Sequence, residues 1–166
     1  MIIPEKLKIG DKIGIISTAR KVTLEELKAA ILILESWGLE IVLGKNLFKE
    51  NIQFSGTIQQ RTADLQSMID NGAIKAILCA RGCYGSVQRI DSIDFTNLKK
   101  NSKWIVGYSD ITVLHSHFHN LGFASIHATM PINFETNTKG SLESLKNSLF
   151  GIETVSYTHL TLPTKA

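Results

Sequence analysis

The chain has 166 residues, of which 43% are hydrophobic and 20% charged, and its formal net charge is +3. This composition is typical of a globular protein, and the scattered lysines and arginines form no basic stripe, so nucleic-acid binding is not predicted. The apolar runs are too short to span a membrane, and the first residues lack the features of a signal peptide. We therefore expect a cytoplasmic protein without a nucleic-acid or membrane partner.

Three strands and two helices are predicted to alternate in the first half of the chain. Strands are expected over residues 12–17 and 39–43. A helix is expected to begin at Thr23, where Glu26 completes a capping box, and to end at Gly38. Its apolar stripe is Leu24, Leu27, Ile31 and Leu34.

A polar segment over residues 45–56 is predicted to be an irregular surface loop. The second helix is expected to begin at Thr57, with Gln60 completing another capping box, and to stop at residues 71–72. The buried face of this helix is predicted to contain Leu65, Met68 and Ile69. The continuous apolar run over residues 73–80 indicates a strand that is buried on both faces, as in a parallel sheet.

The second half continues with a glycine-rich turn over residues 81–86 and a short helix over 87–90. Residues 93–102 are expected to be a connector, and residues 122–127 a further strand. A last short helix is predicted to end at Gly151. Its apolar residues are Leu142, Leu145 and Leu149.

The alternation of strands and helices predicts an α/β fold with a doubly wound, mostly parallel sheet, either flavodoxin-like or like class I glutamine amidotransferases. In such a sheet, ligands bind outside the carboxyl ends of the strands. Three unusual loops are expected there, at residues 17–20, 81–86 and 107–110. The fold is assigned to residues 1–152, because residues 153–166 have no periodicity that continues it and are predicted to be a non-native or disordered tail.

Residues 103–118 are the most informative stretch of the chain. Residues 104–106 form a short apolar run with β character, and Gly107 can take a backbone conformation that a residue with a Cβ resists. The buried face of the helix that follows is predicted to contain Ile111, Leu114, Phe118 and Leu121. Ser109 is therefore expected at the corner between strand and helix, where free backbone N–H groups face its hydroxyl.

This corner has two interpretations. It is similar to the nucleophile elbow G-x-S-x-G, with Ile111 in place of the second glycine, which would make Ser109 a nucleophile. In the alternative, Ser109 only caps the helix. For the side chain of Asp110, a role as cap and dipole partner is favoured over a chemical one.

Other chemistries are less well supported by the sequence. His115, His117 and His119 lack a carboxylate or cysteine at ligand spacing, so a metal site is not predicted. Cys79 and Cys83 are too few for zinc and are expected to be reduced thiols. Cys83 as a nucleophile lacks a histidine in the right context, and the turn at 81–86 lacks the lysine of a phosphate-binding loop.

Taken together, several short motifs resemble the LD-carboxypeptidase family, the serine peptidases that trim murein tetrapeptides and include the microcin C self-immunity peptidases. They are, in family order, residues 10–15 (GDKIGI), 56–57 (GT), 60–61 (QR), 63–65 (ADL), 81–85 (RGCYG), 107–112 (GYSDIT) and 127–130 (HATM). Two departures are Cys83, where the family usually has glycine, and HATM in place of the usual HGPM.

The resemblance implies one domain of a two-domain parent that acts through a Ser-Glu-His triad. Of this triad only Ser109 would be present, because the family's Glu and His lie in a carboxyl-terminal domain, and the chain as given is therefore expected to be inactive. His159 lies in the suspect tail and is not assigned as the base. No cofactor is expected, and the parent is expected to be a homodimer acting on a murein peptide or a related small peptide.

The same resemblance implies roles around the nucleophile. The backbone N–H groups of Asp110 and Cys83 would bind the oxyanion of the tetrahedral intermediate. Arg81, Gly82 and Tyr84 are candidates for binding substrate, with Arg81 pairing with its terminal carboxylate. Alternatively, residues 81–86 are merely a tight turn, Arg81 forms a structural ion pair, and Tyr84 covers the edge of the core.

The predicted activity is that of a serine carboxypeptidase, which cleaves an L,D peptide bond and releases D-alanine from murein tetrapeptide. Two alternatives stay open: an immunity-type peptidase acting on peptidyl-nucleotides, and a non-enzymatic ligand-binding α/β module.

Overall fold

The computed structural model describes residues 1–85 and 92–152, and its centre is a parallel sheet of five strands. The strands are β1 (Lys12–Ile16), β2 (Glu40–Leu43), β5 (Ile74–Cys79), β6 (Trp104–Gly107) and β7 (Ile126–His127). Their order in the sheet is β2-β1-β5-β6-β7, and every pairing is parallel. Counted along the chain this is the order 2-1-3-4-5 of the flavodoxin-like fold, so the predicted architecture is confirmed.

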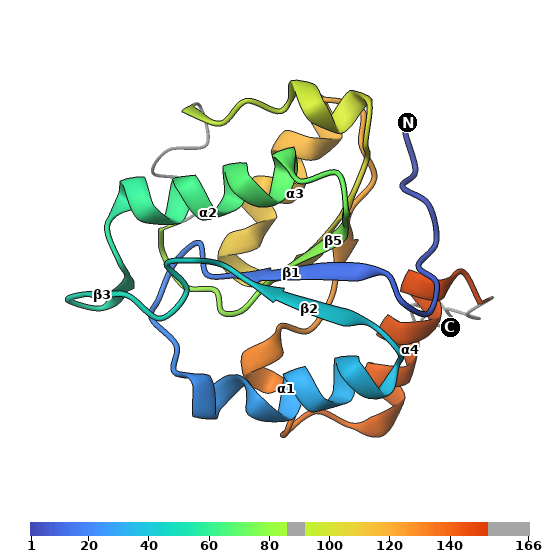
Figure 1. The fold of residues 1–166 in the computed structure, drawn as a ribbon, viewed down its shortest axis with the longest axis horizontal. Helices are drawn as coiled ribbons and strands as arrows, with labels where there is room; N and C mark the ends of the chain where they lie inside the picture. The colour runs from blue at the N-terminus through green and yellow to red at the C-terminus, as the bar shows by residue number, and fades with distance from the viewer. Residues whose placement is uncertain (86–91, 153–166) are drawn as a thin grey trace, which may run out of the picture.

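Helices cover both faces of the sheet (Figure 1). On one face lie α1 (Leu24–Ser36) and α4 (Lys139–Phe150), and on the other lie α2 (Ile58–Asp70) and α3 (Thr112–Asn120). Each face has its own buried cluster. The first is built around Ile13, Ile15, Leu27, Leu34, Leu78, Phe134 and Leu149, and the second around Leu65, Ile69, Ile77, Ile105, Leu114 and Phe118. The sheet is therefore the middle layer of three.

Three helices begin at a threonine whose side chain caps the first turn. Thr23 Oγ1 accepts from the Glu26 N–H at 3.2 Å, while the Glu26 carboxylate accepts from the Thr23 N–H at 2.8 Å. Thr57 and Gln60 form the same reciprocal pair at α2, and Thr138 caps α4. Both predicted capping boxes are confirmed, as is Gly151, which ends α4 with φ +67°.

Four expectations about packing and extent are wrong. Leu24 is 57% exposed at the first position of α1, where its side chain lies outside the contact with the sheet, and Ala30 is buried instead. Leu121 is 39% exposed because it is the C-cap of α3, where the helical face has ended. The loop 45–56 contains an antiparallel ribbon, β3 (Glu50–Asn51) with β4 (Phe54–Ser55). Only Ile126–His127 of the strand expected over 122–127 joins the sheet, since Phe123 pairs with Ile2.

The connectors contain short 3-10 turns: η2 (Thr96–Lys99), η3 (Ser109–Ile111) and η4 (Pro131–Asn133). The helix predicted over residues 87–90 and the tail 153–166 lie outside the described residues. Among the residues that the structure describes, no helix is long and apolar enough to cross a membrane.

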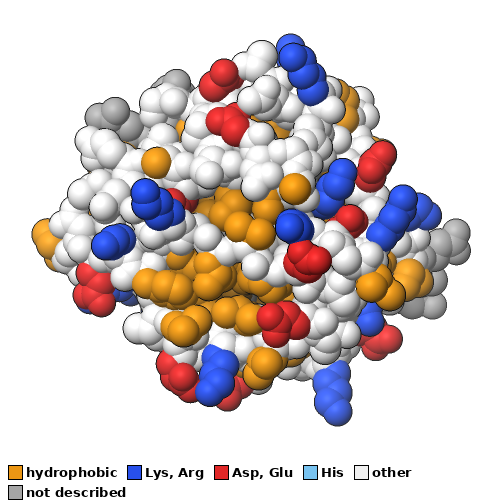
Figure 2. All heavy atoms as spheres, in the orientation of Figure 1, with side chains coloured by type: hydrophobic (Ala, Val, Ile, Leu, Met, Phe, Trp, Pro, Cys, Tyr) orange, Lys and Arg blue, Asp and Glu red, His pale blue; other side chains and the backbone are white. Residues whose placement is uncertain are grey.

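Strand β2 forms one edge of the sheet. Its Ile41, Val42 and Leu43 are only half-buried. Figure 2 shows hydrophobic side chains on both sides of this edge, towards α2 and towards α1. The carboxyl ends of β1, β5 and β6, which are neighbours in the sheet, carry the three unusual loops.

Candidate active site

Ser109 lies two residues beyond the carboxyl end of β6, with its backbone in the left-handed region at φ +61°. Such a conformation is uncommon for a residue with a side chain and costs about 1–2 kcal/mol. The residue is exposed, and the N-cap positions of η3 and α3 are Tyr108 and Ile111, neither of which carries a side-chain cap. The interpretation of Ser109 as a helix cap is therefore wrong, and the corner has the strained backbone and the exposed residue that a nucleophile elbow requires.

The role expected for Gly107 needs a correction. Its φ is not positive, and the residue that takes the unusual conformation is Ser109 itself. A Cβ at position 107 would lie 2.8 Å from Cγ1 of Ile111, so glycine is required for space. Ile111 is fully buried and occupies the position of the second glycine in G-x-S-x-G. The close approach of strand and helix at this corner is therefore made by Gly107 and Ile111.

The carbonyl oxygen of Gly107 is held by two donors. The backbone N–H of Ala128 donates to it at 3.1 Å, and Nε2 of His115 lies 2.9 Å away. Because a carbonyl can only accept, Nε2 carries the proton, and Nδ1 accepts from the Ser125 hydroxyl at 2.8 Å. Burial lowers the pKa of His115 and favours this neutral form. His115 thus fixes the strand end before Ser109 and has no nitrogen left for a metal.

The glycine-rich turn lies beside Ser109. A Cβ on Gly82 would lie 3.4 Å from the Ser109 Cβ and 3.4 Å from the Tyr108 carbonyl oxygen, so the two backbones approach closely. Cys83 has φ +88°, a conformation that glycine adopts without strain. In the described residues the Cys83 amide has no hydrogen-bond acceptor. The turn is therefore close enough to the elbow for a backbone donor to serve the same reacting atom.

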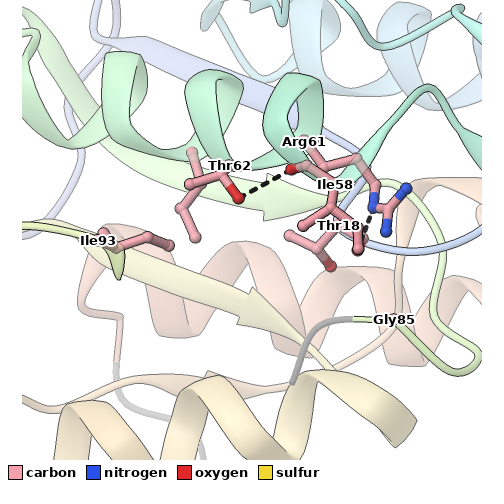
Figure 3. A pocket seen from close by; sticks show the side chains of 7 residues that line it. Thr18, Ile58, Arg61, Thr62, Gly85 and Ile93 are labelled. Carbon is pink, nitrogen blue, oxygen red and sulfur yellow. Dashed lines mark hydrogen bonds between the residues drawn. The ribbon is translucent and has the colours of Figure 1, made fainter. Parts of the chain in front are cut away.

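The loop after β1 supports the turn from behind. Gly85 lies so close to Thr18 and Ala19 that a Cβ would be 3.1 Å from the Ala19 Cα. The buried guanidinium of Arg61, on α2, donates to the Thr18 carbonyl at 3.1 Å and to the Gly56 carbonyl at 2.7 Å. Figure 3 shows this side chain reaching from α2 to Thr18 beside Gly85. Arg61 is thus a structural tie that holds the loop in place.

A cleft opens over Ser109 at this end of the sheet. The described residues that line it include Arg20, Arg81, Gly82, Cys83, Tyr108, Ser109, Met130, Ile132 and Asn133. Arg81 lies 3.6 Å from the Glu26 carboxylate, which is the structural ion pair that the sequence left open. The Tyr108 hydroxyl donates to Oδ1 of Asn133 at 3.2 Å and so fixes the opposite wall.

The remaining predicted residues lie around this centre. Tyr84 is 64% exposed, so it does not cover the core, and it is not among the residues that line the cleft. Asp110 occupies the first turn of η3, which suits a dipole partner, although it is not the N-cap. Cys79 and Cys83 are free thiols, and burial raises the pKa of Cys79 to about 12. Cys79 is therefore an inert core residue.

The sequence did not point to several of the lining residues. Tyr108 is there because it directly precedes Ser109, whereas Met130, Ile132 and Asn133 reach the cleft because the segment of η4 lies against the elbow, where Asn133 accepts from the Tyr108 hydroxyl. Arg20 belongs to a loop that was recognised as unusual but received no role. Among residues 1–85 and 92–152, no group of three or more His, Cys, Asp and Glu side chains is placed to hold a metal ion.

Comparison with known proteins identifies the family. The model of the LD-carboxypeptidase N-terminal domain matches residues 13–128. The chain belongs to the LD-carboxypeptidase family. A probable murein peptide carboxypeptidase of Bacillus subtilis (strain 168) is 38% identical over 128 residues, which cover 76% of this chain and 40% of that protein. The murein tetrapeptide carboxypeptidase of Pseudomonas aeruginosa PAO1 is 33% identical over 120 residues, covering 72% of this chain and 39% of the relative.

Solved structures show the same fold. The microcin C7 self-immunity protein MccF, in complex with aspartyl sulfamoyl adenosine, superposes with a TM-score of 0.83 at 24% identity. The match covers 90% of this chain and 47% of that one. The chain thus spans about half the length, or less, of the family members it matches.

Proposed function

We propose that this chain is the nucleophile-bearing part of a serine carboxypeptidase that cleaves an L,D peptide bond and releases D-alanine from murein tetrapeptide. The observation that carries the proposal is Ser109, exposed at φ +61° beside the glycine-rich turn. Membership of the LD-carboxypeptidase family and the murein-peptide names of two relatives support the reaction and the substrate.

In the proposed mechanism the Ser109 hydroxyl attacks the carbonyl carbon of the bond before the terminal D-alanine. A general base takes the hydroxyl proton and then gives it to the leaving amine, and water hydrolyses the acyl-enzyme. The backbone N–H groups of Asp110 and Cys83 would stabilise the oxyanion. One such donor is typically worth about 2.7–4 kcal/mol in the transition state.

The base is expected in a second domain of a longer protein, together with the glutamate that orients it. His115 cannot take this part in the described structure, because both of its ring nitrogens are engaged with Gly107 and Ser125. We therefore propose that residues 1–152 alone bind substrate weakly and do not turn it over. The homodimer and the cytoplasmic location expected from the sequence stay predictions.

The test compares this chain with a full-length protein that adds the second domain. Each is incubated with murein tetrapeptide, and the release of D-alanine is measured. We expect release only from the full-length protein. D-Alanine released by the 166-residue chain alone would show that the second domain is not needed, and no release from either would argue against the murein substrate.

Parallel incubations separate the two alternatives that the sequence left open. A peptidyl-nucleotide that is cleaved faster than the tetrapeptide would favour the immunity-type activity. Tight nucleotide binding without hydrolysis of either compound would favour a non-enzymatic module.

A further inference from the structure

Arg20 is a cation in the wall of the Ser109 cleft, in the loop that follows β1. Within the described parts of the chain its guanidinium has neither an ion pair nor a side-chain hydrogen bond. The residue is half-buried, so part of its hydration is lost, and no described residue replaces it with a hydrogen bond or an ion pair. A guanidinium in this state is well suited to bind a carboxylate through two parallel hydrogen bonds.

Arg81, the residue that the sequence suggested for this task, is placed differently. Its guanidinium lies 3.6 Å from Glu26, whose other carboxylate oxygen accepts the Thr23 N–H of the capping box. The charge of Arg81 is therefore already offset by an acid that α1 holds in place. Among the residues that the structure describes, Arg20 is the arginine of the cleft wall whose guanidinium has no acid beside it.

The backbone that carries Arg20 is fixed from several sides. The Ser17 hydroxyl donates to the Arg20 carbonyl at 2.6 Å, and the Ser55 N–H donates to the Ala19 carbonyl at 3.0 Å. The N–H of Lys21 donates to the Gln53 carbonyl at 3.1 Å. With the Arg61 bond to Thr18, these contacts hold the loop against the β3–β4 ribbon and α2. A fixed backbone lowers the entropy lost when the side chain binds an anion.

The two sides of the cleft differ in charge. Arg20 and Arg81 lie on the side of the β1 and β5 loops, whereas the side formed by β6 and η4 contributes Tyr108, Ile132 and Asn133, none of which is charged at neutral pH. A peptide with a terminal carboxylate has the same asymmetry about its last bond. Its charged leaving residue matches the arginine side, and its acyl part matches the neutral side.

We propose that Arg20 binds the terminal carboxylate of the peptide and so sets the direction in which the substrate lies across Ser109. This inference rests on the proposed carboxypeptidase function and adds to it the residue that makes the enzyme an exopeptidase. Arg81 then serves to hold the glycine-rich turn against α1.

The test uses the full-length protein and two peptides that differ only at the terminus, a free carboxylate in one and an amide in the other. The wild type should prefer the acid in kcat/KM, and Arg20→Ala should reduce kcat/KM for the acid roughly 10- to 100-fold, the range for a charged hydrogen bond. The loss should lie mainly in KM, because the carboxylate contact is the same in ground and transition states. Turnover of the amide should be unchanged, which shows that the variant is folded.

Two further variants complete the design. Arg20→Lys should keep part of the preference for the acid, because a single cation remains. Arg81→Ala, the matched control from the same cleft wall, should keep the preference in full. The assignment would be overturned if Arg20→Ala lowered kcat/KM equally for both peptides, or if the variant still preferred the acid.

The failure of this inference is distinguishable from failure of the proposed function. If the wild type cleaves the acid while Arg20→Ala keeps its preference, only the role of Arg20 is wrong. If the wild type cleaves neither peptide, the carboxypeptidase proposal itself fails. A binding titration in the Ser109→Ala background gives a readout without turnover, and there Arg20→Ala should weaken binding of the acid peptide alone.

Discussion

The start of α2 and the start of α3 differ in whether a side chain caps the first turn. At α2, Thr57 and Gln60 satisfy each other's backbone N–H groups, and the first turn is closed by protein. At η3 and α3 no side chain caps the turn, and Ser109 holds a left-handed conformation in the cleft wall. A helix start that serves the fold is capped, whereas the start in the cleft wall is open in the sense that no side-chain cap is present among the described residues.

The largest effect is expected at the open start. Ser109→Ala in the full-length protein should reduce turnover by roughly 10⁴-fold or more, because the nucleophile is removed. The melting temperature of the variant should stay within about 2 °C of the wild type, since no cap is lost. Release of D-alanine measures the first, and calorimetry the second. Activity retained by this variant would contradict the assignment of the nucleophile.

The capped start should show the reverse pattern. Thr57→Ala should lower the free energy of unfolding by about 1 kcal/mol, because the Gln60 N–H loses its acceptor. Turnover should be unaffected at temperatures where the protein is folded. Urea denaturation with and without the change measures the difference, and Thr23→Ala provides the matched variant at α1. Loss of turnover in either folded variant would contradict the view that the capped helix starts contribute to stability alone.

Cys83 shares the left-handed backbone of Ser109, although its proposed role is made by the backbone alone. Cys83→Gly should therefore raise the free energy of unfolding by up to about 1 kcal/mol, since glycine relieves the strain and offsets part of the gain by its own entropy. Turnover should be kept, because the N–H remains. Cys83→Val is the contrasting variant and should lose stability. An inactive Cys83→Gly enzyme would point to a chemical role for the thiol.

The smallest effect on stability is expected from Lys103, which contacts the carboxyl-terminal end of α2. Nζ of the buried Lys103 donates to the carbonyls of Asn71 and Ile74 at 2.7 and 2.8 Å, and desolvation lowers its pKa to about 8. The unfolded chain, with the ordinary pKa of 10.5, binds this proton more tightly. Stability from this group should therefore rise as the pH increases above about 8.

Thermal unfolding between pH 7.5 and 9 measures this effect. We expect the melting temperature of the wild type to rise by about 2 °C relative to Lys103→Met over this range. Cys79, whose pKa is raised from 9.0 to about 12 by burial, makes stability fall with pH over the upper part of this range in both proteins, so only the difference between them reports on Lys103. Parallel curves for the two proteins would contradict a buried, perturbed lysine.

Local signals predicted the frame of the molecule well. The two capping boxes, the glycine at the end of α4 and the alternation of apolar runs depend on residues close in sequence, and the structure has them where they were expected. The errors arose where an end or an exposure depends on distant neighbours. Leu24 and Leu121 follow the apolar pattern but lie beyond the packed part of their helices, and Phe123 pairs with the amino terminus instead of extending β7.

For the candidate site, the sequence placed Ser109 at the corner between strand and helix, but it assigned the strain to the wrong residue. Glycine is needed at 107 because Ile111 approaches the strand closely, and the residue that takes the positive φ is Ser109. The difference between Arg20 and Arg81 was also hidden, because it depends on Glu26, a residue more than 50 positions away from Arg81.

The sequence by itself determined the order of strands and helices, the capped helix starts and the presence of a serine at a strand-to-helix corner, because periodicity and capping depend on neighbours within a few residues. Only the tertiary structure decided which loops meet over that serine and which arginine of the cleft wall lies beside Glu26. Those outcomes depend on the parallel pairing of β1, β5 and β6, which brings three segments far apart in the chain together at the carboxyl ends of the strands.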